Sequence, residues 1–509
     1  MKFNSLGEMF ISNAERLKRK KFIFFENRVY SYSDAMSRIF HFAGLLKSRG
    51  LKKGDRVGVL LENSPEFIFS VFSIFLNGAI AVPINTFLKH DEIAYILRDS
   101  GAKFLITSQS FDEETGGFDI ETLEGVLHAE NDTIKELKGS ESAKGDFAVS
   151  ESNLDDVAIL IYTSGTTGNP KGAMLTHKNL ISNVDACNQA FKIKKNDRFL
   201  LFLPMFHSYA FTTCIMLPTF TGCSIIILKS VMDLKKKSFK NILLFKRPTF
   251  FLGVPQVYTA LTKSKLPQWF IKFLYPVRIH VSGGAPLPEE ILKGFVEKFK
   301  RPILEGYGLS EASPVVSVNR EEFQKPYSVG PALPGVDVKV VDDNEVEVPT
   351  GEVGELIVKG PNVMKGYWNM PEATSMTIRN GWLFTGDFAR VDSDGFIYIV
   401  DRKKDLIIVK GINLYPREIE ELIYTYEGVE AAAVIGIPDK ASGEVPVAYV
   451  MPKEGANISG EDLKEFLKSK LANFKIPKHV YVTNELPITA TGKVLKRKLK
   501  EQVLAHLKG

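Results

Sequence analysis

The sequence predicts an α/β protein with a large N-terminal domain and a small C-terminal domain. Three observations support this class. Apolar strands alternate with amphipathic helices through residues 1–108 and again from Asp156 to about Pro314, which is typical of right-handed crossovers in mainly parallel sheets. Segments with period two, separated by Gly-, Pro- and Asn-rich turns, begin near Val329 and indicate a small antiparallel β-barrel or sandwich. The residues beyond Asp405 have a strand–helix pattern of their own, as a separate small domain would.

We therefore expect an N-terminal domain (residues 1–400) of two α/β subdomains and a small β-barrel subdomain, and an α+β C-terminal domain (residues 401–509). Early in the chain, helices are expected at 33–49, 65–77 and 91–100, and strands at 56–61, 79–83 and 103–107. Ser33 is the expected N-cap of the first helix and Gly50 its stop. Residues 109–153 are acidic and weakly periodic, so we expect a surface excursion there rather than a core element.

The composition excludes several classes of protein. Of 509 residues, 44% are apolar and 25% charged, and the net charge of +5 is too small to indicate a nucleic-acid partner. Three cysteines cannot form a disulfide framework and lack the spacing of a metal site, which favours a reducing compartment. The N-terminus has no apolar signal core, so we expect a cytoplasmic protein. A homodimer is left open.

Two uncharged stretches, 67–84 and 199–228, are long enough to span a bilayer. Gly and Pro residues break both, so we expect a helix–strand unit and a strand–helix–strand unit buried in the α/β core. Peripheral contact with the inner membrane surface is left open.

The most informative stretch is Tyr162-Thr-Ser-Gly-Thr-Thr-Gly-Asn-Pro-Lys-Gly172, which follows an apolar strand. Glycines let consecutive backbone N–H groups face one anion, and hydroxyls and a lysine add donors and charge. It is not a Walker A loop, because its lysine is followed by Gly172. A polar surface loop is the alternative. The candidate phosphate-binding residues are Thr163, Ser164, Gly165, Thr166, Thr167, Gly168 and Lys171.

As a whole, this string resembles the ATP-phosphate loop of the adenylate-forming (acyl-activating) superfamily, which includes acyl- and aryl-CoA ligases, peptide-synthetase adenylation domains and firefly luciferase. The resemblance extends from about Phe22 to Leu499, and the other signatures follow in the expected order. They are Leu203–Phe211 (LPMFHSYAF), Ser282–Pro286 (SGGAP), Glu305–Glu311 (EGYGLSE), Trp382–Asp387 (WLFTGD), Asp401–Asp405 (DRKKD), Lys410–Pro416 (KGINLYP) and Pro487–Lys493 (PITATGK). The closest resemblance is to fatty acyl-CoA ligases.

The resemblance implies a nucleotide site and a magnesium site. Tyr307 would stack on adenine, Ser310 would offer its hydroxyl to the α-phosphate, and Glu311 with Thr166 would hold Mg²⁺. Asp387 would bind the ribose hydroxyls, with Arg402 as a second ribose or phosphate contact. The further ATP- or AMP-binding residues it implies are Gly283, Gly284, Ala285, Glu305, Gly306 and Gly308. Taken alone, each of these short signatures is also typical of an ordinary turn or loop.

The resemblance also implies sites for the acid and for CoA. His207 would lie near the carboxylate, where the alternative is a satisfied core histidine. The acyl pocket would be lined by Tyr209, Phe211, Val254 and Val281, with Ala285 nearby. No Asp lies between Arg198 and Val231, which argues against an α-amino acid substrate.

Three residues near the C-terminus would serve the two half-reactions. Lys493 would be the adenylation catalyst, because its compact cation can bridge the carboxylate and the α-phosphate. Lys404 would be the hinge of a mobile C-terminal domain, and Gly411 would lie on the CoA tunnel. The basic residues from Lys470 onward would assist CoA phosphates or an anionic membrane surface, or form a solvated face.

The resulting hypothesis is ATP-dependent activation of a medium- or long-chain fatty acid to acyl-AMP, followed by transfer to CoA, with ATP, Mg²⁺ and CoA required. The enzyme alternatives are an acyl-AMP or acyl-carrier-protein ligase and an aryl-CoA ligase. A luciferase-like activity is not excluded by the motifs. An inactive nucleotide-binding sensor is the non-enzymatic alternative, which intact Glu311, Asp387, Arg402 and Lys493 disfavour.

Overall fold

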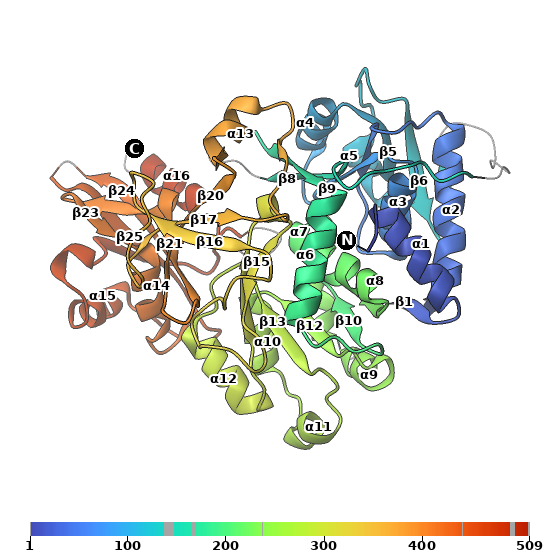
Figure 1. Ribbon diagram of the computed structural model, residues 1–509. Coiled ribbons are helices and arrows are strands. Elements are labelled where there is room, and N and C mark those ends of the chain that lie inside the picture. The colour runs from blue at the N-terminus through green and yellow to red at the C-terminus, as the bar shows by residue number, and fades with distance from the viewer. Residues whose placement is uncertain are drawn as a thin grey trace.

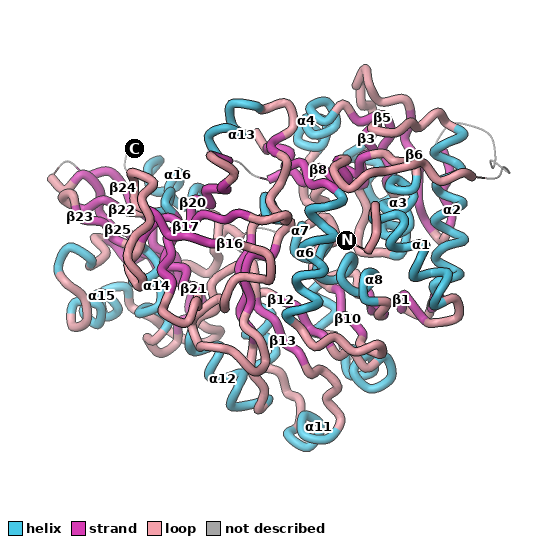
Figure 2. Tube along the Cα trace, in the orientation of Figure 1, coloured by secondary structure: helices cyan, strands magenta, loops and turns pink. Residues whose placement is uncertain are grey.

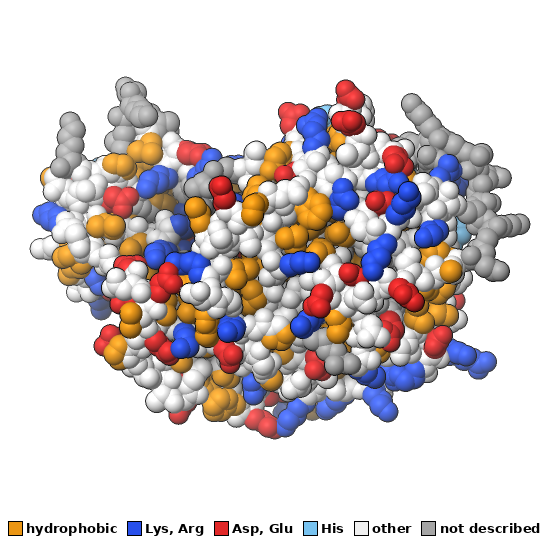
Figure 3. Space-filling model, turned by 45° about the horizontal axis from the view of Figure 1, so that its top comes forward, with side chains coloured by type: hydrophobic (Ala, Val, Ile, Leu, Met, Phe, Trp, Pro, Cys, Tyr) orange, Lys and Arg blue, Asp and Glu red, His pale blue; other side chains and the backbone are white. Residues whose placement is uncertain are grey.

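The computed structural model describes residues 2–136, 147–163, 169–236, 238–439, 441–488 and 494–506. The α/β prediction is confirmed: a large N-terminal domain contains two mainly parallel sheets, and a small C-terminal domain follows (Figure 1). Among the described residues, no helix has the length and apolar character needed to cross a membrane. Acidic, basic and hydrophobic side chains are mixed over the face displayed in Figure 3, so this face has no single dominant charge.

One eight-stranded sheet has the order β18-β9-β8-β4-β3-β5-β6-β7. Its strands are β3 (Arg56–Val59), β4 (Ile80–Pro83), β5 (Ala102–Thr107), β6 (Gly125–Glu130), β7 (Thr133–Glu136), β8 (Val157–Thr163), β9 (Lys171–Thr176) and β18 (Gly366–Tyr367). The chain also forms α1 (Leu6–Leu17), α2 (Tyr32–Ser48), α3 (Pro65–Leu76), α4 (His90–Ser100), α5 (Asp112–Thr115) and α6 (His177–Ala190). Helices α1, α2 and α3 pack on one another (Figure 2). Strand β4 is buried along its whole length.

Two expectations for this region are wrong. The N-cap of α2 is Ser31, not Ser33, because the Ser31 hydroxyl accepts from the backbone N–H of Asp34 and Asp34 completes a capping box. Residues 109–153 are not only a surface excursion, since they contribute β6 and β7 to the sheet, with Leu127, Ala129 and Ile134 buried. The strands in this region are short and lie among acidic turns, so the alternation of apolar and polar residues was too weak to predict them.

A second eight-stranded sheet has the order β15-β14-β13-β12-β10-β11-β1-β2. Its strands are β1 (Lys21–Phe25), β2 (Arg28–Ser31), β10 (Arg198–Leu201), β11 (Ser224–Ile227), β12 (Phe250–Gly253), β13 (Ile279–Ser282), β14 (Leu304–Gly308) and β15 (Val315–Val318). The associated helices are α7 (Ser208–Ala210), α8 (Leu217–Thr221), α9 (Phe239–Asn241), α10 (Pro255–Lys263), α11 (Gln268–Phe273) and α12 (Glu289–Phe299), with π-helical turns at Phe211–Met216 and Ile242–Lys246. The expected strand–helix–strand unit at 199–228 is therefore present and buried. Because β10, β12, β13 and β14 are parallel neighbours, the motifs that follow them meet at one edge of the sheet.

The antiparallel subdomain expected after Val329 is a five-stranded sheet in which β16, β17, β20 and β19 follow one another and β21 pairs with β20. Its strands are β16 (Asp337–Val341), β17 (Gly354–Lys359), β19 (Ile378–Arg379), β20 (Trp382–Val391) and β21 (Ile397–Arg402), and α13 (Pro371–Thr377) lies beside it.

The C-terminal domain has its own five-stranded sheet and its own hydrophobic clusters, centred on residues such as Ile419 and Val434. Its elements are β22 (Ile407–Val409), β23 (Ile412–Leu414), α14 (Pro416–Tyr424), β24 (Val429–Asp439), β25 (Gly443–Pro452), α15 (Gly460–Lys468), β26 (His479–Val482) and α16 (Lys496–His506). A separate core is what an independently placed domain requires.

Candidate active site

Tyr307, Asp387 and Arg402 form one cluster between β14 and the β20–β21 pair. Asp387 and Arg402 are cross-strand partners, which explains their spacing in the sequence. The Tyr307 hydroxyl donates to Asp387 Oδ2 at 2.5 Å, and Arg402 Nε lies 3.3 Å from Oδ1. Asp387 is only 4% exposed, and burial together with this carboxylate raises the pKa of Tyr307. Each carboxylate oxygen keeps a free lone pair, so the group can still accept from two hydroxyls.

Glu311 contacts Tyr367, and Tyr367 in turn contacts Lys171, where the two large sheets approach each other. The Tyr367 hydroxyl donates to Glu311 Oε1 at 2.9 Å, and the Lys171 ammonium lies over the Tyr367 ring, 5.2 Å from its centroid. Burial and the Glu311 carboxylate raise the pKa of Tyr367. Sequence reasoning missed Tyr367, because the Gly-Tyr-Trp segment around it matched no signature that we used.

The surroundings of Glu311 fit a magnesium ion brought by ATP. No group of three or more potential metal ligands occurs in the part of the chain that is described. Mg²⁺ is commonly held by one or two carboxylates together with substrate phosphates rather than by an all-protein cage. The single, partly buried carboxylate of Glu311 is therefore a suitable half-site.

His207 and Ser310 lie on converging loops after β10 and β14. His207 caps α7, where its Nδ1 accepts from the backbone N–H of Tyr209 at 3.2 Å. Burial lowers the pKa of His207 to about 4, so the imidazole is neutral at pH 7. The hydroxyls of Ser208 and Ser310 lie 2.9 Å apart. Ser208 was also missed, although it adjoins His207 in a recognised motif.

The residues expected to line the acyl pocket lie in the apolar interior. Phe211 and Val281 belong to the largest hydrophobic cluster and Val254 to a second one, and Tyr209 packs against both. A Cβ placed on Gly283 would lie 3.3 Å from the Tyr209 ring, so the bare backbone there lets the ring approach. The Tyr209 hydroxyl is buried and has no hydrogen-bond partner among the described residues. Gly284 is exposed and Ala285 half-buried, leaving an accessible stretch of backbone.

Two glycines of the Glu305–Glu311 signature are explained by the chain's own packing. A Cβ on Gly308 would lie 2.1 Å from the carbonyl oxygen of Pro314, and one on Gly306 would lie 3.2 Å from that of Ser317. Both contacts come from the antiparallel pairing of β14 with β15 and the residue before it. Gly308 therefore requires glycine whether or not a nucleotide is bound, whereas the space at Gly306 is only tight.

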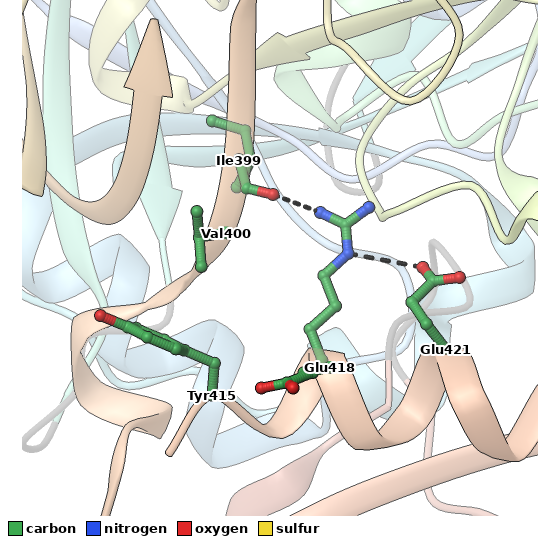
Figure 4. A pocket seen from close by; sticks show the side chains of 6 residues that line it. Ile399, Val400, Tyr415, Glu418 and Glu421 are labelled. Carbon is green, nitrogen blue, oxygen red and sulfur yellow. Dashed lines mark hydrogen bonds and ion pairs between the residues drawn. The ribbon is translucent and has the colours of Figure 1, made fainter. Parts of the chain in front are cut away.

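The expected hinge is close in sequence to a contact between the two domains. Figure 4 shows this contact, with Ile399 of the N-terminal domain near Tyr415 and Glu421 of the C-terminal domain. Lys404 is exposed, and partial desolvation of its ammonium together with the neighbouring Arg402 lowers its pKa. Asp401 accepts from the backbone N–H groups of Arg402 at 2.8 Å and Arg417 at 2.9 Å. The Arg417 guanidinium donates to the carbonyl of Ile399 at 2.7 Å.

Across this contact, the signature residue Glu305 of the N-terminal domain faces α14. The Arg417 guanidinium also lies 3.5 Å from Glu421 on the next turn of α14, beside a cavity of about 310 Å³. Burial raises the pKa of Glu305 to about 7, with Arg417 opposing and Glu421 adding to the shift. An ion pair between Lys263 and Glu430, 2.9 Å, forms a second contact between the domains. Arg417 and Glu421 had no signal in the sequence.

The backbone conformation at position 411 explains why a glycine occupies it. Lys410 (φ 50°) and Gly411 (φ 79°) form the left-handed two-residue turn between β22 and β23, a turn that favours glycine. A Cβ there would meet nothing within 4 Å.

Six predicted residues, Ser164, Gly165, Thr166, Thr167, Gly168 and Lys493, lie outside the described residues. The loop is nevertheless flanked as expected, because Thr163 at the end of β8 pairs with Lys171 at the start of β9.

The basic residues after Lys470 are largely neutralised within the C-terminal domain. Lys475 pairs with Glu418, Lys478 with Asp439, Lys496 with Glu420 and Lys500 with Glu444. A solvated structural face is thus the better interpretation of this charge run.

This chain is similar to known AMP-binding enzymes over most of its length. A family model described as AMP-binding enzyme matches residues 10–368, and one described as AMP-binding enzyme C-terminal domain matches residues 418–493. A feruloyl-CoA synthase of Amycolatopsis sp is 38% identical, covering 93% of this chain and 94% of that protein. A long-chain-fatty-acid–CoA ligase of Bacillus subtilis is 34% identical, covering 98% and 94%.

Solved structures of two proteins share the complete architecture. ATP-bound MatB from Rhodopseudomonas palustris is 32% identical, with a TM-score of 0.88 over 98% of this chain and 99% of that one. Apo MatB, at the same identity and coverage, gives 0.77, so the domain arrangement here is nearer to the ATP-bound form. MenE from Bacillus subtilis in complex with ATP and magnesium ion is 29% identical, with a TM-score of 0.84 over 97% and 99%.

Proposed function

The chain belongs to the AMP-binding enzyme family and is an ATP-dependent, AMP-forming acid–CoA ligase, and from this premise we propose that its acid is a medium- or long-chain fatty acid. The observation that carries the proposal is the lining of the expected acyl pocket. Tyr209, Phe211, Val254 and Val281 contribute a single polar side-chain atom, the Tyr209 hydroxyl, and all lie in or against large hydrophobic clusters. An apolar chain gains about 0.8 kcal/mol per buried CH₂ in such surroundings.

In the first half-reaction, a carboxylate oxygen attacks the α-phosphorus of ATP and pyrophosphate leaves. We assign the ribose to Asp387, which Tyr307 and Arg402 hold in place, and the α-phosphate to the Ser310 hydroxyl. Neutral His207 adds no charge beside the carboxylate. Glu311 would hold the Mg²⁺ that accompanies ATP, and the ion would there supply positive charge to the phosphates. Lys493 is assigned the remaining cationic contact.

In the second half-reaction, the CoA thiol attacks the acyl-AMP carbonyl and AMP leaves. We assign a rotation of the C-terminal domain (residues 401–509) about Lys404 to this step, with Gly411 beside the CoA tunnel. Lys493→Ala should then abolish acyl-AMP formation and spare thioester formation from supplied acyl-AMP. Equal loss of both steps would contradict the assignment.

The test of the substrate is acid-dependent pyrophosphate release from ATP, measured from acetate to oleate and with benzoate and ferulate, with and without CoA. A maximum among aliphatic acids of medium or long chain, with thioester formed only when CoA is present, is expected. A maximum at acetate or at an aromatic acid would contradict the fatty-acid proposal. Pyrophosphate release without thioester would indicate an acyl-AMP or carrier-protein ligase instead.

A hydroxyaryl acid is the second candidate. The buried, unpartnered Tyr209 hydroxyl favours it, because a substrate hydroxyl or methoxy group would satisfy an atom whose burial otherwise costs about 1–3 kcal/mol. The 38% identical relative is a feruloyl-CoA synthase. Tyr209→Phe should reduce kcat/KM for ferulate about tenfold and leave that for an aliphatic acid nearly unchanged if this candidate holds.

We further propose a cytoplasmic location, where ATP and CoA are available and the buried, unpaired thiols of Cys187, Cys214 and Cys223 stay reduced. Peripheral contact with the inner membrane surface and homodimer formation are part of the same proposal.

A further inference from the structure

The two ends of the Tyr162–Gly172 stretch meet in the pairing of β8 with β9. Tyr162 lies opposite Gly172, and the next pair is Thr163 with Lys171. A Cβ at position 172 would lie 3.1 Å from Cζ of the Tyr162 ring, which is closer than ordinary van der Waals contact. The Tyr162 ring therefore lies against the bare backbone of Gly172, and this explains why a glycine follows the lysine.

Helix α4 holds the hydroxyl of Tyr162. This hydroxyl donates to Oδ2 of Asp99 at 2.6 Å, and burial together with the Asp99 carboxylate raises the pKa of Tyr162, so the phenol remains a donor. The backbone carbonyl of Asp99 accepts from Nε1 of Trp368 at 3.1 Å, and the backbone N–H of Trp368 donates to the carbonyl of Gly172 at 2.8 Å. Asp99, Tyr162, Gly172 and Trp368 thus form a closed set of contacts, here called the Asp99 network.

Other contacts join α4 to the same two segments of chain. The Arg56 guanidinium lies over the Trp368 ring, 5.5 Å from its centroid, and donates to two carbonyl groups at the end of α4, each at 2.7 Å. The Tyr95 hydroxyl, also on α4, donates to the carbonyl of Pro170 at 3.3 Å. Helix α4 therefore supports the stretch at Tyr162 and again just before Lys171.

The Asp99 network lies next to groups expected to meet ATP and its magnesium ion. Lys171 directly precedes Gly172, and its ammonium lies over the ring of Tyr367, whose hydroxyl donates to Glu311. Tyr367 directly precedes Trp368. The network therefore holds the backbone on both sides of the contact between Lys171 and Tyr367.

We propose that Asp99 and Tyr162 are positioning residues for ATP, and that their hydrogen bond sets where the Lys171 ammonium meets the phosphates. Both residues act through Lys171 rather than by touching the nucleotide. A hydrogen-bonded network completed before ATP arrives reduces the ordering needed on binding. The proposal rests on the assignment of Lys171 to the ATP phosphates and is independent of which acid is activated.

The experiment compares Tyr162→Phe, Asp99→Ala and Asp99→Asn in the full-length enzyme by acid-dependent exchange of pyrophosphate into ATP. The first two variants should raise the KM for ATP at least about fivefold. The double variant Tyr162→Phe with Asp99→Ala should raise it no further, because both changes remove the same bond. Asp99→Asn keeps an accepting oxygen and should stay within about twofold of the parent.

A second readout separates positioning from a merely structural role. Thioester formation from supplied acyl-AMP, which carries no β- or γ-phosphate, should be unchanged in every one of these variants. The matched control is Tyr30→Phe, which removes another tyrosine–aspartate bond, to Asp132 at the opposite edge of the same sheet. It should leave the KM for ATP unchanged whatever its effect on the melting temperature.

An unchanged KM for ATP in Tyr162→Phe would overturn the proposal. Loss of both half-reactions in step with the melting temperature, or an equal rise of KM in Tyr30→Phe, would also overturn it and indicate a structural role only. Lys171→Ala tests the premise separately. An unchanged KM in Lys171→Ala would overturn the phosphate assignment and the proposal with it, whereas a rise in Lys171→Ala alone would overturn only the positioning role.

Discussion

The Tyr307 hydroxyl donates a hydrogen bond of 2.5 Å to Oδ2 of Asp387, joining two signatures that lie 80 residues apart. The bond holds the tip of a ring expected to stack on adenine and orients a carboxylate expected to bind ribose. Arg402 holds the other oxygen of that carboxylate. Both nucleoside contacts are thus set before ATP arrives, which reduces the ordering needed on binding.

Tyr307→Phe keeps the ring and removes only this hydrogen bond. A net contribution of about 1 kcal/mol predicts a KM for ATP raised about fivefold, with a smaller change in kcat. Steady-state kinetics of pyrophosphate release with ATP varied would measure it. The matched control is Tyr398→Phe, which removes a 3.2 Å bond to Asp392 away from the site. An unchanged KM in the Tyr307 variant would show that the bond has no role in ATP binding.

Glu311→Gln should reduce acyl-AMP formation about 10²–10³-fold, because a neutral amide is a poor Mg²⁺ ligand and transition-state charge loses its stabilisation. The Mg²⁺ concentration needed for half-maximal rate should rise as well. Tyr367→Phe, which removes only the 2.9 Å bond to Glu311, should cost less than about tenfold. A magnesium titration of both variants separates these roles. The same Mg²⁺ dependence in the parent and in Glu311→Gln would remove Glu311 from the metal site.

The buried Glu305 should make stability depend on pH. Its folded-state pKa is raised to about 7, so its favourable contribution is complete below its unfolded pKa and is lost as pH rises through about 7. Glu305→Gln removes this loss. Relative to the parent, the variant should therefore gain stability between pH 5 and pH 8, by at most about 3 kcal/mol. Melting temperatures across this range would test it, with the exposed Glu297→Gln on α12 as control. A parallel pH profile for parent and Glu305→Gln would contradict it.

The sequence predicted the class of fold because strand–helix alternation is a local pattern that parallel sheets impose over many residues. It also predicted that Asp387 and Arg402 act together, and strand pairing explains why. Tyr367, Ser208 and Arg417 could not be assigned, since each reaches the site through pairing or docking between segments far apart in the chain. The N-cap of α2 was misplaced because Ser31 and Ser33 are both plausible caps, and the side chain of Asp34 decides between them.

The last prediction concerns two signature glycines, Gly308 and Gly411, whose substitution should have different effects on stability. Gly308→Ala would place a Cβ 2.1 Å from the Pro314 carbonyl oxygen, so the paired strands β14 and β15 must shift. We expect destabilisation by about 3 kcal/mol and a clearly lower melting temperature. Gly411→Ala meets open space and strains only a φ of 79°, at about 1 kcal/mol.

Measuring the two half-reactions separately distinguishes a loss of stability from a loss of CoA binding in these variants. If Gly411 lies on the CoA tunnel, Gly411→Ala should keep acid-dependent exchange of pyrophosphate into ATP and slow thioester formation. The matched control is Gly455→Ala, which also has open space and a positive φ of 80° in the C-terminal domain. Loss of thioester formation in both variants would trace the effect to backbone strain, and its loss in neither would place the tunnel elsewhere. Gly308→Ala, by contrast, should impair both half-reactions together because its conflict lies within the nucleotide signature.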